Sequence, residues 1–124
     1  GTKIYASETS TAAPFFKSLH AGSPQKIDYV PSFIDGIGSA GILTEMWSLV
    51  SSLVNASIVI SPEEIAKAIK LLMQRSRVIA EGAGGSSVAA ALTGKAGYGK
   101  IVCVVSGGNI DLEKIVKIIN DQLP

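Results

Sequence analysis

The sequence predicts an α/β fold with parallel strands, because short apolar runs alternate along the chain with helical patterns. Runs with the composition of strands stand at residues 4–6, 57–60 and 101–105. The third run, IVCVV, is apolar at every position, which is typical of a strand covered on both faces of its sheet. A helical pattern follows each run, so we expect crossover connections between parallel strands.

The first half of the chain predicts a strand followed by two helices. After the strand at residues 4–6, apolar residues at helical spacing predict a short helix that ends at Gly22. Over residues 44–54 apolar side chains recur at steps of three and four residues. This spacing predicts a buried helix with Trp47 in the core.

The second half contains the clearest local signal. Residues 61–64 read Ser-Pro-Glu-Glu, in which the serine can cap a helix, the proline suits the first helical position and the second glutamate closes a capping box. A helix after the strand at 57–60 is therefore expected. Small residues over 88–92 predict another helix, and a last amphipathic helix uses apolar residues of the C-terminal segment, namely Leu112, Ile115, Val116 and Ile119.

Composition excludes several classes of protein. The chain has 124 residues, of which 47% are hydrophobic and 17% charged, so a disordered chain is excluded. A net charge of +1 predicts binding neither to nucleic acid nor to an anionic membrane surface. The longest uncharged stretch, residues 46–62, contains six serine or asparagine residues and is shorter than the roughly 20 residues that a membrane span needs. With no signal-peptide pattern at the N-terminus, a cytoplasmic location is expected.

Two glycine-rich turns are the candidate ligand sites, at residues 82–85 and 107–108. We expect both at junctions between a strand and a helix, where free backbone N–H groups bind phosphate or carboxylate. The alternative is a tight turn that needs glycine only for a positive φ. Glu81 and Ser106 immediately precede the two turns, where each could contact a ligand or serve only the turn.

These motifs together resemble one family. The stretches VIAEGAGGSSVAAAL at 78–92 and VVSGGNID at 104–111 are similar to the C-terminal part of pyridoxal-phosphate enzymes of fold type II. Shorter upstream stretches agree in order and spacing, and the resemblance covers essentially the whole chain. It is strongest to the serine/threonine dehydratases and serine racemases, which implies a three-layer, tryptophan synthase β-like fold.

The resemblance assigns expected roles to five residues. Ser106 would hydrogen-bond the pyridine nitrogen of pyridoxal phosphate, and Gly36 would lie against one face of the cofactor ring. Glu81 would order the site beside the turn that contains Ser106 and Gly107. Glu8 matches a carboxylate that binds a divalent cation in some members, whereas Pro14 stands where a second acidic ligand is expected.

The resemblance also implies what lies outside this chain. The family's Schiff-base lysine in a Ser-x-Lys context and its glycine-rich phosphate loop are absent. Residues 1–124 are therefore expected to be the C-terminal part of the large cofactor-binding domain, inactive alone and completed by the N-terminal half. The expected parent is a homo-oligomeric threonine/serine dehydratase that converts L-threonine to 2-oxobutanoate and ammonia. The alternatives are serine racemase, another lyase of this fold type, or a non-catalytic domain that binds a small anion or a partner chain.

Overall fold

Two parallel strands form the centre of the computed structural model, which describes residues 1–124. Strand β1 (Tyr5–Thr9) pairs with β2 (Ala56–Ile60) in a register that places Tyr5 opposite Ala56 and Thr9 opposite Ile60. Both strands fall where the apolar runs at residues 4–6 and 57–60 predict them.

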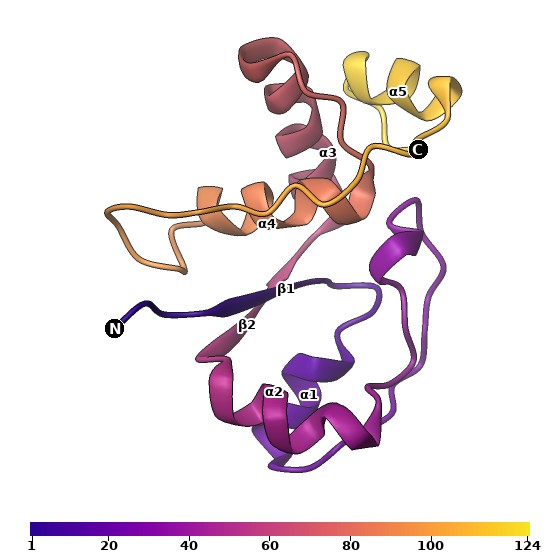
Figure 1. The fold of residues 1–124 in the computed structure, drawn as a ribbon. Helices are drawn as coiled ribbons and strands as arrows, with labels where there is room; N and C mark the ends of the chain where they lie inside the picture. Colours follow the sequence, from indigo (N-terminus) through magenta and orange to yellow (C-terminus); the bar gives the residue numbers. More distant parts are fainter.

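Helices cover both faces of this sheet (Figure 1). On one side lie α1 (Pro14–Ala21) and α2 (Trp47–Leu53), and on the other lie α3 (Pro62–Leu71), α4 (Gly82–Leu92) and α5 (Leu112–Ile119). The predicted α/β class with a parallel sheet between helical layers is confirmed.

Helix α3 begins as the capping residues predict. The Ser61 hydroxyl accepts a hydrogen bond from the Glu64 N–H (3.2 Å), and the Glu64 carboxylate accepts one from the Ser61 N–H (2.8 Å). The helix buries Ile65 and Ile69 against α4, and a Cβ on Gly85 would lie only 2.6 Å from Ile69 Cγ1. Glycine at this position therefore allows the two helices to approach closely.

The predicted strand at residues 101–105 is wrong. This segment makes no backbone–backbone hydrogen bond, and Val102 and Val104 are 91% and 69% exposed. A strand requires a neighbouring strand that pairs with its main chain, and neither β1 nor β2 pairs with this segment. The run has the apolar, β-branched composition of a strand, but it does not pair with β1 or β2.

The helix predicted over residues 44–54 is shorter and more exposed than expected. A 3₁₀ turn (Thr44–Met46) leads into α2, in which Leu49 and Leu53 are both more than half exposed. Trp47 is half-buried and packs edge-on against Phe15, with ring centroids 6.4 Å apart. The periodicity identifies an apolar face correctly, but only α1 and the edge of β1 cover it.

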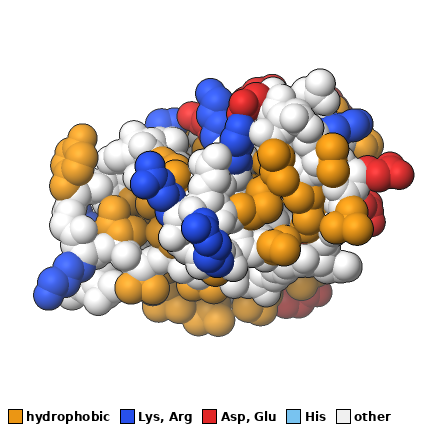
Figure 2. Space-filling model, turned by 90° about the horizontal axis from the view of Figure 1, so that it is seen from above, with side chains coloured by type: hydrophobic (Ala, Val, Ile, Leu, Met, Phe, Trp, Pro, Cys, Tyr) orange, Lys and Arg blue, Asp and Glu red, His pale blue; other side chains and the backbone are white.

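The C-terminal helix α5 packs on α3 through a different residue from those predicted. Ile118 is buried, whereas Leu112, Val116 and Ile119 are exposed. Figure 2 shows apolar side chains gathered on the face that carries α3, α4 and α5 (seen from the top of Figure 1). None of the helices is both long and apolar enough to span a membrane.

Candidate functional site

The N-terminus of α4 begins within the glycine run rather than after it. Gly82 is the first helical residue and Glu81 is the N-cap. The glycines at residues 82–85, which were predicted to make a turn before the helix, therefore make up its first turn. Gly82, Gly84 and Gly85 all have negative φ, which excludes the alternative that they are glycines because of a left-handed backbone. Their function is instead to let other segments approach the helix.

Two segments pack against this first turn where side chains would collide. A Cβ on Gly82 would lie 2.8 Å from the Ile34 Cα, and a Cβ on Gly36 would lie 3.0 Å from the Ala83 Cβ. On another side, the carbonyl oxygen of Gly107 occupies the space that a Cβ on Gly84 would need. Three stretches that are far apart in the sequence therefore meet at the start of α4.

Glu81 connects the helix to the loop of residues 106–108. Its N–H donates a hydrogen bond to the Gly107 carbonyl oxygen (3.1 Å), and its carboxylate occupies the space that a Cβ on Gly107 would need. Ser106 is the preceding residue and is exposed. The structure thus brings together the four residues predicted to bind the cofactor, Gly36, Glu81, Ser106 and Gly107. Their binding roles stay predictions.

Two serines that sequence reasoning missed fix α4 in place. The Ser86 hydroxyl pairs with that of Ser7 on β1 (2.9 Å) and donates to the Ala83 carbonyl (2.7 Å). The Ser87 hydroxyl donates to the Val104 carbonyl (2.8 Å), which anchors the segment leading to Ser106. The available signal was the presence of two hydroxyls in a helix otherwise made of glycine, alanine, valine and leucine.

Glu8, the predicted metal ligand, is buried at the end of β1 and contacts protein donors. Its carboxylate accepts hydrogen bonds from the N–H groups of Phe15 (2.8 Å) and Phe16 (2.7 Å) and from the Ser57 hydroxyl. It thereby caps α1, whose own N-cap residue Ala13 has no side-chain acceptor. No group of three acidic, histidine or cysteine side chains in the structure could hold a metal ion. A metal role for Glu8 stays a prediction.

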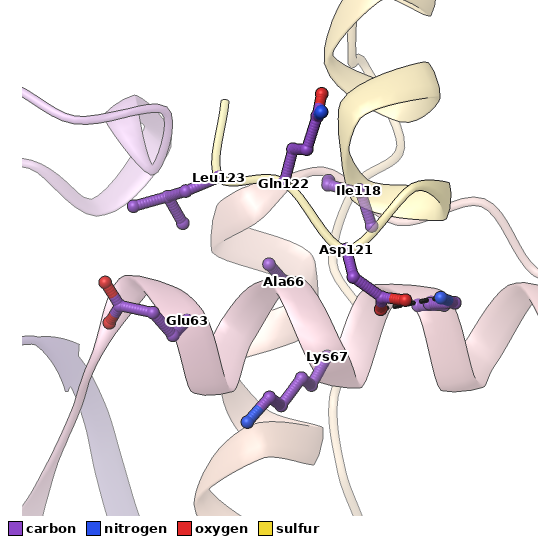
Figure 3. Close-up of a pocket in the computed structure, with 8 residues that line it drawn as sticks. Glu63, Ala66, Lys67, Ile118, Asp121, Gln122 and Leu123 are labelled. Atoms are coloured by element: carbon purple, nitrogen blue, oxygen red, sulfur yellow. Dashed lines mark hydrogen bonds and ion pairs between the residues drawn. The ribbon is translucent and has the colours of Figure 1, made fainter.

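The cavity shown in Figure 3 lies between α3 and the C-terminal segment, away from the Ser106 loop. It has a volume of about 210 Å³, with Ala66, Ile118 and Leu123 among its lining residues and an ion pair between Lys70 and Asp121 (2.6 Å). At its edge, the pKa of the Glu63 carboxyl is lowered, chiefly by its own backbone N–H at the start of α3 and then by the Ser61 hydroxyl. The charged side chains around this cavity make no contact with the residues at the first turn of α4.

Comparisons with known proteins find relatives over nearly the whole chain. The chain is 37% identical to L-threonine ammonia-lyase of Thermotoga maritima, in an alignment that covers 98% of this chain and 30% of that protein. It is 33% identical to L-threonine ammonia-lyase of Geobacter sulfurreducens, covering 98% and 31%. The chain therefore spans about 30% of the length of these curated relatives.

Two solved structures resemble the fold closely. Threonine deaminase isoform 2 from Solanum lycopersicum superposes with a TM-score of 0.84 at 28% identity, over 97% of this chain and 36% of that one. Maize serine racemase superposes with a TM-score of 0.82 at 28% identity, over 95% and 39%. The profile described as "Pyridoxal-phosphate dependent enzyme" matches residues 1–107, a span that contains all four residues gathered at α4. The chain belongs to the family of pyridoxal-phosphate-dependent enzymes.

Proposed function

We propose that residues 1–124 form part of the cofactor-binding domain of an ammonia-lyase that acts on L-threonine or L-serine. The reaction is β-elimination, which yields 2-oxobutanoate and ammonia from L-threonine. The observation that carries the proposal is the meeting of Gly36, Glu81, Ser106 and Gly107 at one helix N-terminus. The names of the Thermotoga and Geobacter relatives support the choice of reaction.

The residues at α4 fit one end of pyridoxal phosphate. Gly36 and Gly107 let their main chain pack closely against Ala83 and Glu81, which brings both segments to the α4 N-terminus, beside which the ring of the cofactor would lie. The exposed Ser106 hydroxyl next to Gly107 is a suitable donor for a ring nitrogen. When bound, pyridoxal phosphate withdraws electrons from the bonds at the substrate's α-carbon.

Ser106 would set the protonation of the ring nitrogen. A neutral hydroxyl donates a hydrogen bond without supplying a negative charge, so the nitrogen stays largely unprotonated and the ring is a weaker electron sink. A ring that withdraws electrons less strongly favours β-elimination of a hydroxyl over transamination, in which negative charge stays on the substrate and ring for longer. Glu81 acts as a positioning residue, because its N–H bonds to the loop that carries Ser106 and its carboxylate packs beside Gly107 of that loop.

We further propose that this chain has no activity by itself. The resemblance places the lysine that binds the cofactor, and the loop that binds its phosphate, in other parts of the enzyme. The substrate would be a small hydroxy amino acid, and the complete enzyme a homo-oligomer. Two lysines precede Ser106 closely in the sequence, Lys95 and Lys100. Neither stands in the Ser-x-Lys context of the family's Schiff-base lysine.

A chimera tests this function directly. Residues 1–124 replace the matching stretch of the Thermotoga relative, and the purified chimera is assayed for 2-oxobutanoate and ammonia from L-threonine. We expect activity in the chimera, its loss in Ser106→Ala, and full activity in Ser52→Ala, a control on the exposed side of α2. A folded chimera that binds pyridoxal phosphate without deaminating L-threonine or L-serine would contradict the proposal. Formation of D-serine would instead favour the racemase.

A further inference from the structure

The Ser87 hydroxyl is directed out of its own helix. Elsewhere in the helices of this chain, serine hydroxyls donate to the carbonyl three or four residues earlier, as Ser18, Ser52 and Ser86 do. Ser87 instead donates to the carbonyl of Val104, which lies 17 residues further along the chain (2.8 Å). Its hydroxyl therefore serves the segment that lies beside the helix.

This bond is the one hydrogen bond that reaches residues 101–105. The run makes no backbone–backbone hydrogen bond, and its only side-chain partner is Ser87. The next bond from α4 to this part of the chain joins the Glu81 N–H to the Gly107 carbonyl (3.1 Å). Helix α4 thus holds the segment at two points, one on each side of Ser106.

The two points are spaced alike on both segments. From Glu81 to Ser87 the chain rises about 9 Å along α4, at about 1.5 Å per residue. From Val104 to Gly107 an extended main chain spans about 10 Å. The segment runs antiparallel to α4 (Figure 1), so the two bonds leave the main chain around Ser106 little slack.

Side chains of the segment alternate in exposure. Val104 and Ser106 are exposed, whereas Val105 between them is half-buried and packs against the core. Successive side chains of an extended chain point to opposite sides, so a rotation of the segment about its axis would turn the Ser106 hydroxyl away from its present direction. By fixing the Val104 carbonyl, Ser87 fixes the side to which Ser106 points.

We infer that Ser87 is a positioning residue for the ring nitrogen of the cofactor, because its bond to Val104 sets the orientation in which Ser106 meets that nitrogen. The inference rests on the proposed function, which supplies the cofactor and the role of Ser106. Without the Ser87 hydroxyl, the Glu81 bond is the only hydrogen bond from α4 that remains. The Ser106 hydroxyl then also takes orientations that do not reach the ring nitrogen.

The first test uses the 124-residue chain without cofactor. Ser87→Ala should speed hydrogen exchange of the Glu81 amide, which makes the remaining bond, at least about threefold. Ser87→Thr keeps the hydroxyl and should restore slow exchange. Exchange of single amides is followed by NMR. An unchanged rate in Ser87→Ala would show that the Ser87 bond does not hold the segment, and would overturn the inference.

The second test uses the chimera with the Thermotoga relative, loaded with pyridoxal phosphate that carries ¹⁵N at the ring nitrogen. The NMR signal of this nitrogen reports its hydrogen bond. Ser87→Ala should move the signal in the same direction as Ser106→Ala and by a smaller amount, and Ser87→Thr should leave it in place. Added to Ser106→Ala, Ser87→Ala should move it no further, because Ser87 acts through Ser106. Additive movements would contradict the inference.

Ser86→Ala is the matched control, since it removes a neighbouring hydroxyl that bonds to β1 and not to the segment of Ser106. It should lower Tm and leave the ¹⁵N signal in place. Movement equal to that in Ser87→Ala would show that any loosening of α4 is sufficient, and would overturn the role of Ser87.

The ¹⁵N signal requires binding of the cofactor and no turnover. A chimera that binds the cofactor but does not deaminate L-threonine therefore refutes the proposed reaction and still tests Ser87. Movement in Ser106→Ala without movement in Ser87→Ala would refute Ser87 alone. No movement in Ser106→Ala would refute the role proposed for Ser106, and this inference with it.

Discussion

The Glu81 N–H donates a hydrogen bond to the carbonyl oxygen of Gly107, and the Glu81 carboxylate lies against the same glycine. One residue thus bonds to the loop that carries Ser106 through its main chain and packs beside that loop with its side chain. The close packing of Gly84 on the same carbonyl reinforces the contact. The geometry around Ser106 therefore depends on the spacing between α4 and residues 106–108.

Substitution Gly84→Ala should separate α4 from this loop. The new Cβ would collide with the Gly107 carbonyl, which is main chain and cannot move without shifting the loop. Overpacking of this kind costs about 1–3 kcal/mol, partly offset by the better helix propensity of alanine. We expect a lower denaturant midpoint and faster amide exchange at Glu81, and in the chimera a loss of activity. Gly41→Ala, where the new Cβ makes ordinary contacts of 3.7 Å or more, should change neither.

Substitution Glu8→Gln should destabilise the chain through α1. The amide offers one oxygen in place of two and turns its NH₂ group toward the N–H donor of either Phe15 or Phe16, which then has no acceptor. Loss of a buried, charged acceptor costs about 1.5–3 kcal/mol. Thermal unfolding measures the effect, with exposed Glu45→Gln as the control. Repeating it with Mg²⁺ or Ca²⁺ tests the cation prediction, which requires a cation-dependent rise in Tm that Glu8→Gln removes.

The chain mixed with pyridoxal phosphate should form no stoichiometric imine at one lysine. Exposed lysines react weakly and without selectivity, and the resemblance implies that the loop that binds the cofactor's phosphate is not among residues 1–124. Borohydride reduction followed by mass mapping of peptides reads out the modified positions. A single, fully labelled lysine would mean that these residues contain their own attachment site.

The lowered pKa of Glu63 makes a small part of the stability depend on pH. A carboxyl whose pKa is lower in the folded state stabilises it above the unfolded pKa near 4.5. That contribution is lost as pH falls below 4.5 and through the folded value. Urea unfolding of Glu63→Gln should therefore differ from wild type at pH 7 and converge with it at low pH. Glu45→Gln serves as control, and a difference that grows as pH falls would refute the assignment.

In the active chimera, Ser106→Asp should protonate the ring nitrogen of the cofactor. A carboxylate stabilises the protonated nitrogen, which makes the ring a stronger electron sink and favours side reactions such as transamination. The ratio of pyridoxamine phosphate to 2-oxobutanoate should rise. Ser106→Thr, which keeps the hydroxyl, should leave the ratio near that of the parent. An unchanged ratio in the aspartate variant would argue against Ser106 as the partner of this nitrogen.

Local signals in the sequence predicted local structure well. The capping box at Ser61 and the helix end at Gly22, which has φ of +70°, depend on neighbouring residues only. The grouping of Gly36 with Glu81 and Ser106 could be predicted only from the family resemblance, because no pattern in one stretch reveals which others pack against it.

The predictions that were wrong concern the burial of side chains and the pairing of strands, which depend on distant segments. The run at 101–105 has the composition of a strand, but a ladder needs a second chain segment beside it. The apolar face of α2 has the correct period, yet its exposure depends on what covers it. Composition thus indicates which surfaces are apolar enough to be buried, but it does not show which segment packs against them.

The loop between α4 and the 101–105 run contains three glycines with positive φ, Gly94, Gly97 and Gly99, and its Tyr98 is 98% exposed. A protease that cuts there would divide the molecule into a piece with the sheet and α4 and a piece with Ser106 and α5. The interface between these pieces includes the Ser87, Glu81 and Lys70 contacts, the close packing of Gly84 on Gly107 and the burial of Ile118. These contacts lie outside the loop at residues 94–99, so the loop can lengthen or change sequence while Ser106 stays in place beside α4.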